Sequence, residues 1–274
     1  MMRKLLSIGT SSWSSADWVG TFYPDKMKPT DFLRFYATKY DTVEVDSTFY
    51  RLPTAWLCKK WAKDTPETFR FALKVTRDIT HDKVLVGCEE EWEKFLGAVG
   101  ELGPRLGFIV FQFGYFNKQS ACPDVGTFLK RLADFSKRCP NRHEYVVEIR
   151  NPRWISEEFL ETLREHRFSF ALTDQQWMPR PTELWEKFGE KLFSRNHAYI
   201  RFLGERERIE KITKTWEKIV IDRTKETKEW VETVIRQALA KRIPVWVYIN
   251  NHFAGHAPTS IDLLSEAIRD SGLE

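Results

Sequence analysis

Cysteine is scarce in this sequence, and the few cysteines form no recognisable motif. The four of them stand far apart, at Cys58, Cys88, Cys122 and Cys139. Without a CxxC pairing or a regular spacing, neither a zinc knuckle nor a disulfide framework is indicated. The pattern is typical of reduced thiols, so we expect a protein of the reducing cytoplasm.

Long apolar runs and several well-known motifs are also missing. No stretch approaches the roughly 18 apolar residues of a membrane-spanning helix, and the apolar residues after Met1 stop at Gly9, too soon for a signal peptide. There is no phosphate-binding G-x-x-x-x-G-K-[ST] loop, no G-x-G-x-x-G fingerprint, no G-x-S-x-G elbow and no HExxH. These absences argue against a membrane protein, a P-loop enzyme, a dinucleotide-binding enzyme, an α/β-hydrolase and a zincin.

What the chain does contain is material for a large aromatic core. Of its 274 residues, 42% are hydrophobic, and eleven tryptophans and twenty phenylalanines are among them. The 43 basic and 39 acidic residues give a net charge of +4 that is spread along the chain. This balance permits a polyanionic partner without requiring one. No composition break marks a linker, so we predict one domain over residues 1–274.

Short β-rich runs alternate with segments of helical periodicity, which predicts a single α/β domain, a (β/α)₈ TIM-like barrel of parallel strands with outer helices. The eight predicted strands are Leu5–Ser11, Thr42–Ser47, Phe69–Val75, Leu106–Phe113, Tyr145–Arg150, Phe168–Thr173, Ala198–Phe202 and Val245–Asn250. Thr54, Ser156 and Thr182 are expected to cap helices. The charged stretch between residues 204 and 228 predicts a solvated excursion, either a surface helix or a mobile loop. Its role is left open.

Side-chain parity places polar groups inside the predicted barrel. If Val43 and Val45 face the helices, Glu44 and Asp46 point inward, because successive side chains of a strand alternate between faces. Glu148 enters the barrel by the same argument. Polar residues of this kind fall near the carboxyl end of each strand, where barrel enzymes carry their catalytic groups. One per strand, in chain order, these are Ser11, Asp46, Lys74, Gln112, Arg150, Asp174, Arg201 and Asn250.

An alternative is that this polar ring is a salt-bridged plug, because buried charges are costly unless they are paired. Eight polar strand ends exceed what a plug requires, so we favour a pocket. The loops also carry aromatic side chains that could wall it, although loop packing explains each one singly. They are Trp13, Trp18, Tyr23, Tyr50, Trp154, Trp177 and Phe253.

Ordered motifs between residue 8 and about residue 267 resemble one known family. They include Gly9-Thr10-Ser11-Ser12-Trp13, the run from Thr42 to Tyr50, Phe71-Ala72-Leu73-Lys74, Val147-Glu148-Ile149-Arg150-Asn151-Pro152-Arg153-Trp154 and Tyr248-Ile249-Asn250-Asn251-His252. Together they resemble the DUF72 (YecE-like) family, which implies a TIM-barrel-like fold without a settled activity. The chain departs from the family pattern at Asp46, where Asn is usual, and at Gly114, where Pro is common.

Two functions fit the polar ring. The first is an enzyme, a hydrolase, lyase or isomerase, acting on a phosphorylated sugar, a nucleotide or a phosphodiester. Lys74, Arg150 and Arg201 would hold the anion. The general acids and bases would come from Glu44, Asp46, Glu148, Asp174 and His81. Ser11, Trp13, Tyr50, Gln112, Trp154, Asn250 and Asn251 would line the substrate site. The second is a non-enzymatic nucleic-acid-binding protein that uses the same cations together with exposed aromatics.

Cofactor use stays open at this point. Carboxylates of the ring could hold Mg²⁺ or Mn²⁺ through oxygen. A trinuclear zinc site is disfavoured, because only His81, His252 and His256 stand near strand ends in the sequence. A lone loop histidine is more often a structural residue. No metal ligand is therefore assigned, and the oligomeric state and the substrate are not predicted.

Overall fold

A computed structural model describes residues 5–195 and 197–273 of the chain. The chain forms two compact units. The first comprises residues 1–44, 172–189 and 196–274, and the second comprises residues 45–171 and 190–195. Strands β2 (Thr42–Val45) and β6 (Phe168–Asp174) each contribute residues to both units.

The eight predicted strands are all present and are joined in the order β1-β8-β7-β6-β5-β4-β3-β2. Their bounds are β1 Leu6–Thr10, β2 Thr42–Val45, β3 Arg70–Lys74, β4 Leu106–Gln112, β5 Glu144–Glu148, β6 Phe168–Asp174, β7 Ala198–Phe202 and β8 Val245–Ile249. Helical segments follow each strand, which makes the chain an α/β protein of the (β/α)₈ barrel class. The predicted fold class is confirmed, whereas the single domain stays a prediction.

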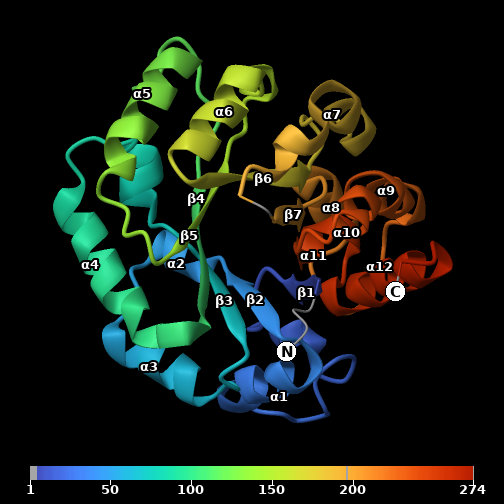
Figure 1. The fold of residues 1–274 in the computed structure, drawn as a ribbon. Coiled ribbons are helices and arrows are strands. Elements are labelled where there is room, and N and C mark those ends of the chain that lie inside the picture. The colour runs from blue at the N-terminus through green and yellow to red at the C-terminus, as the bar shows by residue number, and fades with distance from the viewer. Residues whose placement is uncertain (1–4, 196, 274) are drawn as a thin grey trace. The chain divides into compact units, whose positions relative to one another are not determined.

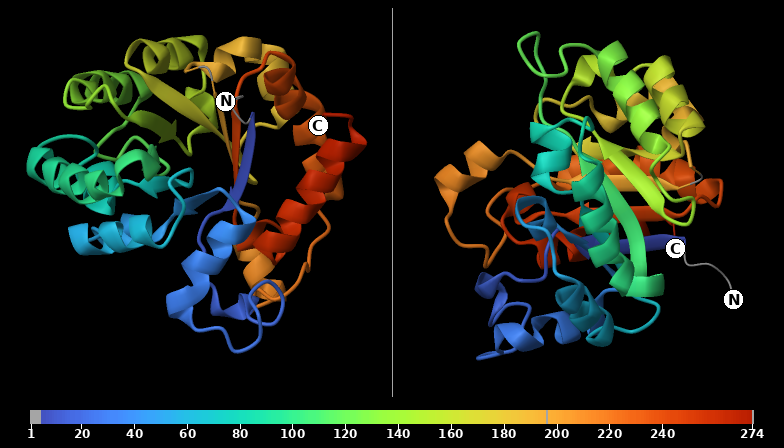
Figure 2. Two further views of the ribbon diagram at one scale, coloured as in Figure 1. Left: turned by 60° about the horizontal axis from the view of Figure 1, so that its bottom comes forward. Right: turned by 90° about the vertical axis from the view of Figure 1, so that its left-hand side faces the viewer.

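In the first unit, β8 lies between β1 and β7 and pairs in parallel with both. Helix α12 contacts β1 and β8 (Figure 2) and buries its predicted apolar face there, including Ile261, Leu264 and Ile268. The helical segments of this unit are η1 Ala16–Trp18, η2 Pro29–Asp31, α1 Phe32–Lys39, α7 Pro181–Phe188, α8 Arg206–Ile212, α9 Thr224–Trp230, η7 Val231–Ile235, α10 Arg236–Ala240, α11 Asn251–Ala254 and α12 Ala257–Asp270. A further segment, η6 Gly189–Phe193, begins in the first unit and continues into the second.

In the second unit, β4 lies between β3 and β5, again with parallel pairing. The aromatic core predicted from composition sits on the helix side of these strands, where Trp92 lies 5.3 Å from both Phe111 and Phe135 between ring centroids. Helices α3 and α4 pack against each other (Figure 1). The helical segments are α2 Ser47–Tyr50, α3 Ala55–Lys63, η3 Asp78–Asp82, α4 Glu89–Val99, η4 Gly100–Arg105, α5 Val125–Ser136, η5 Pro152–Trp154 and α6 Glu157–Glu165.

Two of the three predicted helix caps are confirmed. Thr54 accepts a hydrogen bond from the Leu57 amide at 3.2 Å, and Ser156 accepts one from the Phe159 amide at 3.1 Å. The cap at Thr182 is wrong, because Pro181 already occupies the first helical position of α7. Proline suits that position, since its missing N–H and fixed φ cost the first turn nothing.

The charged stretch between residues 204 and 228 is better ordered than a solvated excursion. It contains α8 and the start of α9, and it is anchored by Ile209, which is fully buried. Arg223 is also buried, and its Nε donates to the Phe253 carbonyl at 3.0 Å. The surface-helix alternative is therefore confirmed for α8, with an apolar anchor that the charge pattern conceals.

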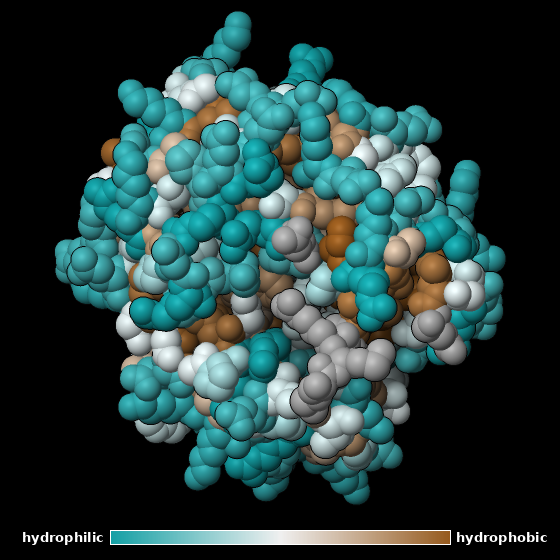
Figure 3. Space-filling model, in the orientation of Figure 1, coloured by the Kyte–Doolittle hydropathy of each residue, from teal (hydrophilic) through white to brown (hydrophobic). Residues whose placement is uncertain are grey.

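The surface is polar, as the composition predicts, and hydrophilic side chains dominate the face seen in Figure 3. A few large apolar side chains are nevertheless exposed, among them Tyr50, Trp56, Tyr115 and Trp177. Across residues 5–195 and 197–273, no helix combines the length and the apolarity that spanning a membrane requires. All four cysteines are buried and free, and burial raises the pKa of Cys58 and of Cys139 to about 12.

Candidate functional site

A buried ion pair connects β2 and β7 in the first unit. Glu44 and Arg201 have at most 1% of their side chains exposed, and Arg201 donates to Oε1 of Glu44 through Nη2 at 2.5 Å and Nε at 3.1 Å. The Tyr199 hydroxyl donates to the other carboxylate oxygen at 2.7 Å. Parity placed Glu44 and Arg201 on the inner face, and the structure brings them together with Tyr199.

Beside this pair lies a layer of buried hydroxyls. The Tyr248 hydroxyl is 2.7 Å from the Thr42 hydroxyl, and the Tyr199 and Tyr248 rings are 5.0 Å apart between centroids. Burial raises the pKa of both tyrosines well above its ordinary value, so both phenols remain neutral hydrogen-bonding groups. Glu44 and Arg201 thus lie beside neutral tyrosine side chains.

Two other buried hydroxyls of the first unit find no hydrogen-bond partner among the residues that the structure describes. Ser11 lies directly after β1 with 4% exposure, and Thr173 lies near the end of β6 with 2% exposure. The Ser11 amide is satisfied by the Ile249 carbonyl at 3.0 Å, so only its hydroxyl is left over. Unsatisfied buried hydroxyls are rare in folded proteins and are often completed by water or a ligand.

Asp174 does not join the predicted polar ring. Its Oδ2 accepts a hydrogen bond from the Trp230 indole of α9 at 2.8 Å, so the carboxylate faces the helix layer. Burial raises its pKa, an effect that the Trp230 hydrogen bond and the charge of Arg180 oppose. The prediction fails because Asp174 has the same strand parity as Phe170, whose ring packs 5.5 Å from that of Phe159 in α6 and so faces the helices. Thr173 has the inward parity instead.

The predicted binding residues after β1 and β8 hold loops together. Asn250 caps α11 by accepting from the His252 amide at 2.9 Å. Asn251 accepts from the Trp18 indole at 3.2 Å and from the Ala257 amide at 2.9 Å. These amides fix the turn after β8, where amide oxygens stand in for missing backbone partners. The carbonyl of Trp13 likewise accepts a hydrogen bond from the Tyr23 hydroxyl.

The second unit carries a different set of charges at its strand ends. Asp46 follows β2 as the residue before α2, and its carboxylate lies 3.0 Å from the Lys74 ammonium at the end of β3. Their side chains keep 27% and 11% exposure. The Lys74 ammonium is also 5.7 Å from the centroid of the Phe49 ring, a distance at which the cation is attracted by the ring face.

A second pair stands at the end of β5. The Arg150 guanidinium is 2.5 Å from the fully buried Glu148 carboxylate, while 19% of the Arg150 side chain stays exposed. The carboxylate therefore holds the guanidinium in place, and part of the Arg150 side chain stays accessible. Gln112, at the end of neighbouring β4, donates to the carbonyl of Phe113 at 2.5 Å.

His81 lies near Lys74 and Arg150. Its Nδ1 is 2.9 Å from the Thr80 hydroxyl, and its ring meets the Phe49 ring edge-on at 4.8 Å. A Cβ added at Gly114 would stand 3.3 Å from the His81 ring, so the residue that departs from the family pattern leaves the imidazole its space. Thr80 and Phe49 were not predicted as site residues. The run Ser47-Thr48-Phe49-Tyr50 beside the polar strand end was the available clue.

The pKa of His81 is lowered from its ordinary value of 6.5. Burial is the largest cause, and the positive charges of Arg77, Lys74 and Arg150 act in the same direction, while Asp82 opposes them. The imidazole is therefore neutral at pH 7. Because Lys74 and Arg150 both act on His81, the three groups share one electrostatic environment.

This shift predicts a pH dependence of stability. The unfolded chain takes up a proton at His81 near pH 6.5, whereas the folded chain takes it up only at lower pH. The contribution of neutral His81 to the free energy of unfolding is therefore complete above pH 6.5 and is lost as the pH falls through the folded pKa. We expect the melting temperature of the wild type to fall more between pH 7.5 and pH 5.5 than that of His81→Gln. Equal falls in both proteins would contradict the shift, because all other histidines remain in the variant.

Two predicted aromatic residues of this unit differ in their surroundings. Trp154 stacks on Phe116 at 5.6 Å and packs 5.5 Å from Phe128 of α5, so it joins a loop to a helix. Tyr50 has 77% of its surface exposed and touches Phe49 at a centroid distance of 5.0 Å. Tyr50 is thus an exposed aromatic side chain next to Phe49, whose ring lies 5.7 Å from the Lys74 ammonium.

No metal centre is formed by the part of the chain that the structure describes. Over residues 5–195 and 197–273, no three His, Cys, Asp or Glu side chains gather as they would around an ion. His252 is held between Asn250 Oδ1 at 2.7 Å and Glu210 Oε1 at 3.2 Å. His256 caps α12 by accepting from the Thr259 amide at 3.2 Å. Both histidines therefore have structural partners.

Comparison with known proteins matches this chain over residues 7–273 to a family described as protein of unknown function DUF72. The protein YecE of Escherichia coli (strain K12) is 28% identical over 152 residues, which are 56% of this chain and 51% of YecE. The chain thus spans about half the length of the curated relatives it matches. A crystal structure of a DUF72 family protein from Thermotoga maritima MSB8 is 27% identical with a TM-score of 0.72, covering 99% of this chain and 100% of that one.

A second solved DUF72 family protein, from Enterococcus faecalis V583, has a TM-score of 0.71 at 21% identity and covers 96% of this chain and 95% of its own. At that identity the likeness concerns the fold. The family match over nearly the whole length decides the assignment together with the motifs at the strand ends. This chain belongs to the DUF72 family.

Proposed function

We propose that the strand ends of the second unit bind the anionic group of a small molecule, such as a phosphorylated sugar, a nucleotide or a phosphodiester. The observation that carries this proposal is that two cations at strand ends of this unit, Lys74 and Arg150, are each held by a carboxylate, at 3.0 Å and 2.5 Å, while part of each side chain stays accessible. Both cations stay partly exposed, with 11% and 19% of their side chains accessible. Arg201, by contrast, is 1% exposed in its pair with Glu44, so we leave it out of the anion site.

The partners of the two cations suit this role. Glu148 is fully buried and orients the Arg150 guanidinium, which can meet a phosphate with two parallel N–H donors. Asp46 keeps 27% of its side chain exposed and is the accessible carboxylate of the cluster. In an enzyme, Asp46 would be the general base and neutral His81 a second proton acceptor. Hydrolase, lyase and isomerase chemistry all fit this pair.

The proposal predicts a loss of binding when either exposed cation is removed. We expect inorganic phosphate, sugar phosphates or nucleotides to raise the melting temperature of the wild type in a saturable manner. Lys74→Gln and Arg150→Gln should each weaken the apparent affinity about tenfold or more, since a charge-assisted hydrogen bond contributes about 1.5–3 kcal/mol. Lys130→Gln, an exposed cation on α5, is the matched control. Affinity that is unchanged in both strand-end variants would refute the proposal.

The same experiment addresses the nucleic-acid alternative. Oligonucleotide binding through many phosphates weakens steeply and log-linearly with added salt, because condensed counterions are released. A small-molecule site with two cations should respond far less. We therefore expect a shallow salt dependence. A steep one that is shared by oligonucleotides of unrelated sequence would favour the nucleic-acid function instead.

A further inference from the structure

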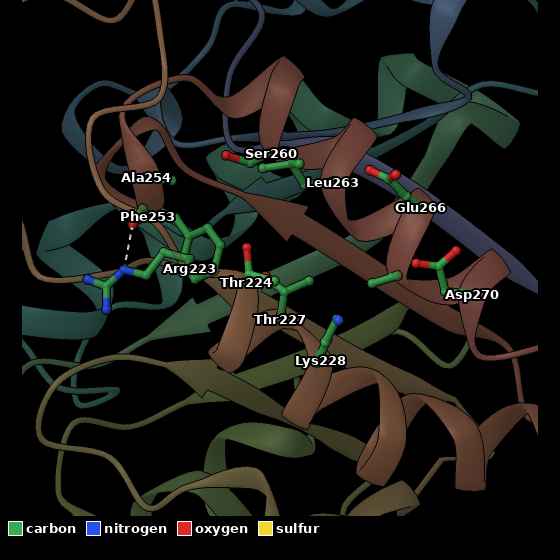
Figure 4. A pocket seen from close by; sticks show the side chains of 11 residues that line it. Arg223, Thr224, Thr227, Lys228, Phe253, Ala254, Ser260, Leu263, Glu266 and Asp270 are labelled. Atoms are coloured by element: carbon green, nitrogen blue, oxygen red, sulfur yellow. Dashed lines mark hydrogen bonds between the residues drawn. The ribbon is translucent and has the colours of Figure 1, made fainter.

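The first unit has a pocket among its helices. Its volume is about 230 Å³, and its walls come from α9, α11 and α12 (Figure 4). Helices α9 and α12 contact each other, as do α11 and α12. The pocket is therefore a depression within a packed helix layer of one unit. No residue of the predicted polar ring lines it.

Opposite charges stand on opposite walls of this pocket. Lys228 extends from α9, and Glu266 and Asp270 extend from α12 (Figure 4). Across residues 5–195 and 197–273, none of the three forms an ion pair or a hydrogen bond through its charged group. Some neighbouring charges are paired, as Arg236 is with Glu232 at 2.6 Å, whereas Lys225, Asp262 and Arg269 also form no ion pair among the described residues. Charges that line a pocket and are unused within the fold remain available to a ligand.

The arrangement on α12 follows from helical spacing. Leu263, Glu266 and Asp270 stand at positions i, i+3 and i+7 and so share one face of the helix. Two carboxylates four residues apart repel each other and weaken a helix. A cation placed between them would relieve that repulsion.

The floor and the end wall of the pocket are apolar and fixed. Phe253 and Ala254 of α11 and Ala267 of α12 are buried and line it, and Leu263 lines it with 39% exposure. Arg223 closes one end, but its guanidinium is occupied by the Phe253 carbonyl and by carboxylates of α9 and of the residue before α8. An apolar group is thus favoured on the floor, while the charged groups of a ligand are left to the side walls.

We propose that this pocket binds a free amino acid with a small apolar side chain. Its carboxylate would meet Lys228, its ammonium would lie between Glu266 and Asp270, and its side chain would cover Phe253 and Ala267. The size agrees, because an apolar cavity of about 150 Å³ takes up benzene, whereas drug-sized ligands occupy pockets of about 300 Å³ or more. The site is independent of the anion site proposed for the second unit.

Matched ligands provide the first test. L-leucine carries both charges, 3-methylbutylamine lacks the carboxylate and 4-methylpentanoate lacks the ammonium, while all three share the same branched chain. We expect L-leucine to raise the melting temperature of the full chain saturably, and each single-charge analogue to bind about tenfold more weakly or not at all. Equal stabilisation by L-leucine and by either analogue would overturn the proposal. So would the absence of any stabilisation by L-leucine, L-valine and L-methionine.

Matched variants provide the second test. Lys228→Gln should lose the preference for L-leucine over 3-methylbutylamine, and Glu266→Gln/Asp270→Asn should lose the preference over 4-methylpentanoate. Lys225→Gln is the control, because Lys225 is exposed on the same helix but does not line the pocket. Lys74→Gln should leave L-leucine binding unchanged, which separates this site from the anion site. A control variant that loses as much affinity as Lys228→Gln would refute the assignment.

Discussion

Replacing Arg201 with methionine is expected to lower the free energy of unfolding by about 3–5 kcal/mol, since it leaves a buried carboxylate without its cation. Glu44 has no exposed surface, and the Tyr199 hydroxyl also donates to its carboxylate. A charge in that position has lost its water, so losing a cation that pairs with it is costly. The midpoint of urea unfolding for Arg201→Met and for the wild type measures the effect.

Removing the whole cluster should cost much less than removing one member. Glu44→Leu/Tyr199→Phe/Arg201→Met removes both charges and the hydroxyl together, and buried ion pairs replaced by apolar residues of similar volume are often neutral or stabilising. We expect the triple variant to recover most of the stability that Arg201→Met loses. Such a recovery would mean that the pair specifies the arrangement of the strands more than it stabilises them.

A surface ion pair supplies the control. Lys59 and Glu101 lie 3.5 Å apart with 64% and 37% of their side chains exposed, and pairs of that kind contribute at most about 1 kcal/mol. Lys59→Met should therefore barely change the urea midpoint. If Arg201→Met were no more destabilising than Lys59→Met, the buried pair would not have the energetic role assigned to it.

The Glu44–Arg201 pair also shows what sequence reasoning can reach. Alternation in Val43-Glu44-Val45 and in Ile200-Arg201-Phe202 was enough to put both charged groups on the inner face. Alternation could not pair them, because partners 157 positions apart in the chain are chosen by the tertiary fold. Asp174 was assigned to the wrong face, because it alternates in step with Phe170, which packs against Phe159 of α6.

The fold was predictable for a different reason than the site. Eight β-rich runs separated by one-sided helices have few alternatives to a parallel α/β arrangement, and errors were confined to the ends of elements. The run predicted to end at Ser47 stops at Val45, because Asp46 takes up helical backbone angles before α2. The pocket between α9, α11 and α12 could not be predicted from the sequence, since Lys228 and Glu266 look like ordinary surface charges there.

Gly9 marks a close approach of the backbones of β1 and β2. A Cβ built at this residue would lie 2.2 Å from the carbonyl oxygen of Thr42 and 2.9 Å from its carbon. Both are backbone atoms, so no rotamer change can relieve the overlap, and the strands would have to move apart. Glycine within a strand is typical of such an approach.

Gly9→Ala should therefore lower the free energy of unfolding by about 3 kcal/mol, the upper end of the usual cost of overpacking. The hydroxyl contact between Thr42 and Tyr248, 2.7 Å long, should weaken with it. Chemical unfolding measures the loss, and hydrogen exchange of the β1 amides should show that it concentrates there.

Gly97 provides the opposite case in the same chain. It lies within α4, is exposed, and would meet nothing within 4 Å if it carried a Cβ. Gly97→Ala should raise the free energy of unfolding by about 0.5–1 kcal/mol, because alanine loses less backbone entropy in a helix. The same substitution is thus predicted to change the free energy of unfolding in opposite directions at the two positions. A destabilising Gly97→Ala together with a neutral Gly9→Ala would show that the close approach of β1 and β2 is not tight.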